Sequence, residues 1–190
     1  MSELTQTNQN PLHKLKIDSY LDSPDKRPRK EPIVMIVVHH TGIGNRGGIS
    51  DPSLWRKLNV NIAKWLATAD PYYVSAHYQI GRYKELTQIV EPEEFVAYHA
   101  GKSSFWHPID RTWRKGCNEF ALGIELLGDG NKEPYSEEQY EKLAEVCKAH
   151  MKYWNIPANM IVGHEMIAPK RKQDPGKYFS WEKFFNVLHS

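Results

Sequence analysis

One run of apolar residues that ends in two histidines, Ile33-Val34-Met35-Ile36-Val37-Val38-His39-His40, decides the fold class of this 190-residue chain. Continuous β-branched runs of this kind are typical of strands buried on both faces of a sheet. A second short apolar run, residues 121–128, is interrupted by the single acid Glu125. Because helical patterns separate such runs, we predict a single-domain α/β fold with a central mixed β-sheet flanked by helices and a site at the strand ends.

The segments between these runs carry helix, hairpin and loop signals. Residues 50–70 place apolar side chains at helical spacing, and Ser136, followed three residues later by a glutamine, forms a helix-capping pattern. Residues 72–80 and 86–90 resemble two strands around a glycine-containing turn, which predicts a hairpin. Residues 99–119 show no period and contain glycine, proline and tryptophan, so we expect a functional loop there.

The N-terminal part of the chain differs in composition from the rest. Residues 1–31 are polar and include the basic run Lys26-Arg27-Pro28-Arg29-Lys30. Charge runs usually remain solvated, so we expect a polar basic leader over residues 1–31 and the catalytic domain over residues 32–190. The alternative is that this run attracts the chain weakly to an anionic surface.

Composition restricts partners and compartment. The formal net charge of +2 argues against nucleic acid as a partner, and no apolar stretch approaches the length of a membrane helix. The first ten residues lack the pattern of a secretory signal, so we expect synthesis in a cytoplasm, with Cys117 and Cys147 as free thiols. Their pairing stays open, because sequence separation does not give distance.

Several metal-binding residue types follow the apolar runs. His39 and His40 stand at the end of the first run, His164 follows another apolar segment, and Asp174 comes ten residues later. Two histidines and a carboxylate can hold zinc while a fourth position stays open. Neighbouring strand residues point to opposite faces, so only one of His39 and His40 is expected to bind. The pattern alone also allows these histidines to be hydrogen-bonded core residues.

Glu125 has two interpretations. A carboxylate within an apolar strand is unfavourable unless it is paired or close to a metal, which favours a general base. Alternation along the strand could instead turn Glu125 to solvent while its neighbours face inward. The pattern does not separate these two possibilities.

At this point the chain resembles the second class of zinc N-acetylmuramoyl-L-alanine amidases, which includes muropeptide-recycling amidases, phage endolysin amidases and peptidoglycan recognition proteins. The resemblance spans roughly residues 33–185. It rests on Ile36-Val37-Val38-His39, Ser75-Ala76-His77-Tyr78, Tyr98-His99-Ala100-Gly101, Cys117-Asn118-Glu119-Phe120-Ala121-Leu122-Gly123-Ile124-Glu125-Leu126, and the run from Gly163-His164 to Asp174-Pro175-Gly176.

The resemblance implies one zinc ion per chain, bound by His39, His164 and Asp174. It implies Glu125 as the general base and Lys172 as the group that stabilises the transition state. Zinc-activated water would then attack the lactyl carbonyl of muramic acid and release L-alanine.

For the substrate, the resemblance places His99 in the groove, and we expect Trp106 and Asn118 to contact peptidoglycan or a muropeptide as well. We also expect a monomer. One departure is His40, where recycling amidases tend to have asparagine. Another is Asp174, where many endolysins and recognition proteins have cysteine, and this favours the recycling branch.

Alternatives to this enzyme remain open. A non-catalytic peptidoglycan receptor would lack a zinc ligand, whereas all three are present here. A purely structural zinc site would need a fourth protein ligand, for which His77, His99 and Cys117 are candidates.

The biological role divides into two hypotheses. The basic leader and the His39-His40 pair favour a phage-type endolysin that acts on the cell wall. The alternative is a cytosolic amidase that trims anhydro-muropeptides for recycling.

Overall fold

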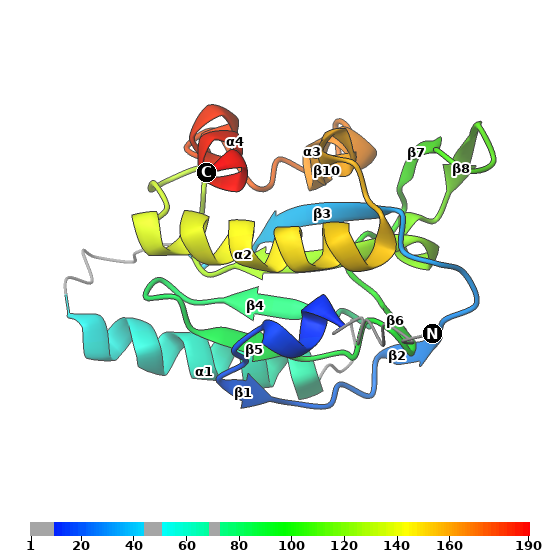
Figure 1. Ribbon diagram of the computed structural model, residues 1–190. Coiled ribbons are helices and arrows are strands. Elements are labelled where there is room, and N and C mark those ends of the chain that lie inside the picture. Colours follow the sequence, from blue (N-terminus) through cyan, green and yellow to red (C-terminus); the bar gives the residue numbers. More distant parts are fainter. Residues whose placement is uncertain (1–9, 44–50, 69–72) are drawn as a thin grey trace, which may run out of the picture.

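The computed structural model describes residues 10–43, 51–68 and 73–190. Its main sheet has six strands in the order β1-β5-β4-β9-β3-β10 (Figure 1). The strands of this sheet are β1 Ser19–Tyr20, β3 Met35–His40, β4 Tyr78–Ile80, β5 Leu86–Gln88, β9 Ala121–Leu126 and β10 Ile161–Gly163. The four strands β4, β9, β3 and β10 are parallel, and β5 is antiparallel to β4. The predicted mixed α/β sheet is confirmed.

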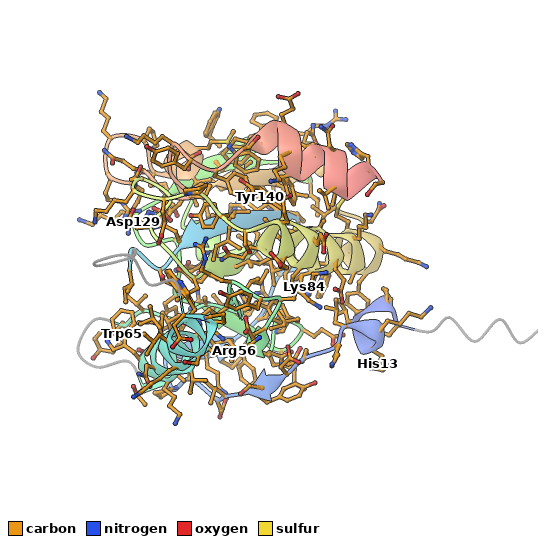
Figure 2. All side chains as sticks on the ribbon, turned by 90° about the vertical axis from the view of Figure 1, so that its left-hand side faces the viewer. His13, Arg56, Trp65, Lys84, Asp129 and Tyr140 are labelled. Atoms are coloured by element: carbon orange, nitrogen blue, oxygen red, sulfur yellow. The ribbon has the colours of Figure 1, made fainter. Side chains whose placement is uncertain are left out.

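Two long helices bury the sheet. The helices are α1 Pro52–Thr68, α2 Glu137–Trp154, α3 His164–Ile167 and α4 Trp181–His189, with short 3-10 turns η1 Pro11–Lys14, η2 Cys117–Glu119 and η3 Ala158–Met160. Helices α2 and α4 contribute to the larger apolar core and α1 to a smaller one. Figure 2 shows α1 end-on below α2, with Trp65 on the first and Tyr140 on the second. Met35 to Val38 of β3 are fully buried in the larger core, which explains why this part of the strand is apolar.

Helix α2 begins as the sequence predicts. The Ser136 side chain accepts a hydrogen bond from the Gln139 N–H, and the Gln139 side chain accepts one from the Ser136 N–H. The helix ends at Trp154, before Asn155 in the left-handed region. The predicted helix over 50–70 corresponds to α1, and residues 50, 69 and 70 lie outside the described part of the chain.

The loop expected over residues 99–119 contains a hairpin. Strands β7 Ser104–His107 and β8 Thr112–Lys115 pair in antiparallel fashion and project from the body (Figure 1). The hairpin packs on the domain through the buried His107, whose ring contacts that of Phe120. Because a histidine occupies this inward position, the apolar alternation that would predict a strand is missing.

The N-terminal segment also differs from the expected solvated leader, over its described part, residues 10–31. Strand β1 joins the main sheet, and β2 Lys26–Pro28 pairs with β6 Phe95–Ala97. Leu12 and Leu15 are buried against the larger core. Isolated leucines and short edge strands attach this polar segment to the domain.

Among the described residues, no helix is long and apolar enough to cross a membrane. Cys117 and Cys147 are both buried and unpaired, as expected.

Candidate metal centre and active site

Parallel strand pairing brings His39 and Glu125 to the same place. His39 on β3 is in register with Glu125 on β9, and residues in register on adjacent strands project from the same face of a sheet. His40 lies one position further along and lines the same pocket, with its ring accepting a hydrogen bond from the Gly42 N–H.

The other two predicted ligands come from the segment after β10. His164 is the first residue of α3, immediately beyond the strand. The chain then turns back, so that the Glu165 N–H donates to the carbonyl oxygen of Asp174 at 3.0 Å. The carbonyl oxygen of Pro175, after a cis peptide bond, accepts a hydrogen bond from the Tyr135 hydroxyl at 2.7 Å. Ten residues of sequence are thereby closed into a loop that places Asp174 beside His164.

The three donor atoms form a compact triangle. The Nδ1 atoms of His39 and His164 are 2.9 Å apart, and each lies 2.9 Å from Oδ2 of Asp174. All three side chains are buried. Zinc bonds of about 2.0–2.1 Å to nitrogen place tetrahedral ligands roughly 3.3 Å apart, close to this spacing. Two imidazole nitrogens and one carboxylate oxygen directed at a single point are a donor set that fits zinc.

The ring nitrogen of His164 that faces away from the cluster contacts a backbone carbonyl oxygen. Its Nε2 lies 3.2 Å from the oxygen of Ala100, so a proton on Nε2 can be donated there while Nδ1 stays free for a metal. Arg171 also donates to the Ala100 oxygen at 2.8 Å and to that of Lys102 at 2.8 Å. Arg171, which the sequence did not single out, therefore fixes the loop that orients His164.

Within the cluster, the surroundings favour a neutral imidazole at His39 and an ionised carboxylate at Asp174. Burial, followed by the charge of His164, lowers the pKa of His39 to about 4 against the opposing effect of Asp174. Burial alone would raise the pKa of Asp174, but hydrogen bonds from His164 and His39 hold it below its ordinary value. These are the protonation states that metal ligands require.

Glu125 faces this cluster and is not turned to solvent. Burial, and then the negative charge of Asp174, raises its pKa to about 8, and Lys172 acts in the opposite direction. Its Oε2 is buried and has no hydrogen-bond partner within the described part of the chain. A carboxylate of raised pKa in a pocket is suited to accept and return a proton.

An open pocket of about 730 Å³ joins these groups, with Glu125 and Lys172 in its lining. Of the predicted substrate residues, His99 and Asn118 also line it. The Oδ1 atom of Asn118 accepts hydrogen bonds from the N–H groups of His99 at 3.1 Å and Ala100 at 2.7 Å, so it shapes the loop. Trp106 does not line the pocket and lies half-exposed on β7.

Two glycines, which the sequence did not assign to the site, allow its close packing. A Cβ atom on Gly123 would collide with the ring of His99, and one on Gly130 with the carbonyl oxygen of Pro175. A glycine inside a strand is a known signal of close approach, which Gly123 displays in β9. The sequence alone does not say what approaches it.

Comparisons with known proteins agree with this geometry. A family model described as N-acetylmuramoyl-L-alanine amidase matches residues 29–177. The 1,6-anhydro-N-acetylmuramyl-L-alanine amidase AmpD of Haemophilus influenzae is 39% identical over 168 residues, which cover 86% of this chain and 87% of that protein. AmpD of Escherichia coli is 35% identical over 163 residues, covering 84% and 85%. A crystal structure of a selenomethionine AmpD derivative superposes with a TM-score of 0.72 at 32% identity, covering 92% of this chain and 96% of that one.

The fold and site thus define a hydrolase with a buried His-His-Asp cluster that could hold a metal ion, at strand ends beside a buried carboxylate. More particularly, the chain belongs to the N-acetylmuramoyl-L-alanine amidase family. The predicted reaction class, amide cleavage between N-acetylmuramic acid and L-alanine, is confirmed. The predicted endolysin role is not supported by these AmpD relatives, which favour the recycling alternative.

Proposed function

We propose that this chain is a zinc-dependent amidase that acts on soluble 1,6-anhydro-muropeptides in the cytoplasm as part of cell-wall recycling. The observation that carries the proposal is the buried triangle of His39, His164 and Asp174 beside Glu125. The substrate class is supported by the AmpD relatives, which are 1,6-anhydro-N-acetylmuramyl-L-alanine amidases. A structure of a more distant amidase, AmiD of Escherichia coli, contains anhydro-N-acetylmuramic acid-L-Ala-D-γ-Glu-L-Lys as its substrate.

In this proposal His39, His164 and Asp174 hold the ion, and no fourth protein ligand joins them. The metal-capable group within the described residues has these three members, so a coordination position stays available for solvent or substrate. When bound there, zinc supplies Lewis-acid chemistry and lowers the pKa of a coordinated water to about 7. The complete ligand set supports an enzyme over a non-catalytic receptor.

The protein's own groups supply the proton transfers and the electrostatic support. Glu125 accepts a proton from the attacking water and returns it to the leaving nitrogen of L-alanine. Lys172 lines the same pocket, and its ammonium group stabilises the negative charge that develops on the lactyl carbonyl oxygen. His99 and Asn118 form part of the pocket wall.

The role can be tested by giving the zinc-loaded protein two substrates, a soluble 1,6-anhydro-muropeptide and intact sacculi. We expect rapid release of free peptide from the soluble fragment, detected by mass spectrometry, and little release from sacculi. Efficient solubilisation of sacculi would favour the endolysin role instead. Cleavage of neither substrate at the muramic acid–alanine bond would refute the proposed reaction.

A further inference from the structure

The ring of His99 lies directly behind His39, on the side away from the other two ligands. Its Nδ1 is 2.9 Å from Nε2 of His39, and the two rings meet edge to face with centroids 5.0 Å apart. His99 is only 6% exposed, although it reaches the pocket wall. Nδ1 thus contacts His39, whereas Nε2 of His99 is buried and has no hydrogen-bond partner within the described part of the chain.

The hydrogen-bonding capacity of imidazole fixes the direction of this contact. A neutral imidazole carries one proton, and a His39 ring that binds zinc must keep the lone pair of Nδ1 free for the ion, because Nδ1 is the nitrogen on the side of Asp174 and His164. The proton then sits on Nε2, where it is donated to a neighbouring acceptor. We propose that His99 is a positioning residue whose Nδ1 accepts this proton's hydrogen bond and so fixes the tautomer and the ring orientation of His39 for zinc.

The surroundings of His99 hold that acceptor rigidly. The ring packs on β9 at Gly123, where a Cβ atom would lie 2.7 Å from Nδ1 of His99, closer than real Cβ atoms come to other groups. The backbone N–H of His99 donates to Oδ1 of Asn118 at 3.1 Å. Behind it, the ring of His77 stands edge to face at 5.7 Å and accepts a hydrogen bond from the Gly123 N–H.

His164 offers a comparison within the same site. Its outer nitrogen is directed at a backbone carbonyl, that of Ala100, which is a usual partner for a metal-bound histidine. For His39 the corresponding partner is a side chain, so it can be changed by substitution. The inference rests on the proposed function for the identity of the metal ligands, and it adds a role for His99 that does not require contact with substrate.

Two substitutions separate hydrogen bonding from packing. His99→Asn keeps an oxygen acceptor close to the position of Nδ1, whereas His99→Leu keeps apolar bulk and removes the acceptor. The zinc dissociation constant of each is measured by competition with a chelator. Losing an outer partner of a ligand typically weakens metal binding about 10–100-fold. We expect that loss for His99→Leu and wild-type affinity for His99→Asn.

His150→Leu is the matched control. His150 is fully buried and lies 3.2 Å from the Tyr78 hydroxyl, so its loss should lower stability and leave zinc affinity unchanged. Circular dichroism and thermal unfolding establish that each variant is folded. Should His99→Leu not fold, His99→Phe, which keeps a ring without the acceptor, takes its place.

Equal affinity in the wild type and the acceptor-free variant would overturn the inference, as would equal weakening in His99→Asn and His99→Leu. A wild-type protein that binds no zinc at all would instead refute the proposed function. The two failures are therefore distinguishable.

Discussion

Replacing Gly130 by alanine should weaken zinc binding, although Gly130 is not itself a predicted zinc ligand. A Cβ atom built on Gly130 would lie 1.8 Å from the carbonyl oxygen of Pro175, and real Cβ atoms essentially never approach below 3.0 Å. The obstacle is backbone and cannot rotate away. The two segments must therefore separate by at least 1.2 Å, the difference between these two distances. Because Asp174 directly precedes Pro175, the displacement reaches a predicted zinc ligand.

The expected effect on zinc follows from that distance. Even if the two segments share the displacement equally, Asp174 moves by about 0.6 Å, roughly three times the ±0.2 Å tolerance of metal–ligand distances. We expect Gly130→Ala to weaken zinc binding by at least about tenfold, with about 1–3 kcal/mol lower stability from overpacking. Chelator competition and denaturant unfolding measure the two quantities.

Tyr135→Phe is the control for this change. It removes the hydroxyl that donates to Pro175 at 2.7 Å without adding an atom, so it should lower stability by about 1 kcal/mol and alter zinc affinity less. Wild-type zinc affinity in a folded Gly130→Ala protein would show that the close contact at Pro175 does not position Asp174.

Three further predictions concern individual side chains. Glu125→Gln should lower kcat about 10²–10⁴-fold at unchanged zinc content, and a kcat close to wild type would exclude Glu125 as the base. His39→Ala should abolish zinc binding while His40→Ala retains it; metal analysis showing the reverse would move the ligand to position 40. Burial lowers the pKa of His150 to about 3, below its unfolded value, so its stabilising contribution is present above about pH 6.5 and declines by roughly 1.4 kcal/mol per pH unit as acid protonates the unfolded chain. His150→Gln should flatten the measured stability between pH 4 and 6, and an unchanged slope would contradict this assignment.

The sheet was predictable because its signals are local, whereas the set of His39, His164 and Asp174 followed from the family resemblance and not from the local pattern. An apolar run followed directly by His39 predicts a buried strand and places a polar side chain at the end of that strand. Glu125 was ambiguous in the sequence, since alternation allowed either face. Only the pairing of β9 with β3 showed that it lies in register with His39 and faces the pocket.

Other features depend on contacts between distant segments. Nothing near Gly123 in the sequence indicates that the ring of His99 occupies the space left by its missing side chain. Leu12 and Leu15 stand in a short segment that is rich in charged and polar residues, and its sequence does not indicate that they pack against the core. The hairpin formed by β7 and β8 was not predicted from the sequence, because the buried His107 breaks the apolar alternation of its strand.

The central claim is that one zinc ion is held by His39, His164 and Asp174 with a coordination position open to solvent or substrate. Anomalous diffraction at the zinc edge, from crystals of the zinc-loaded protein, tests it most directly. We predict a single peak within bonding distance of Nδ1 of both histidines and a carboxylate oxygen of the aspartate. A peak elsewhere, or a fourth protein side chain completing the coordination, would contradict the account.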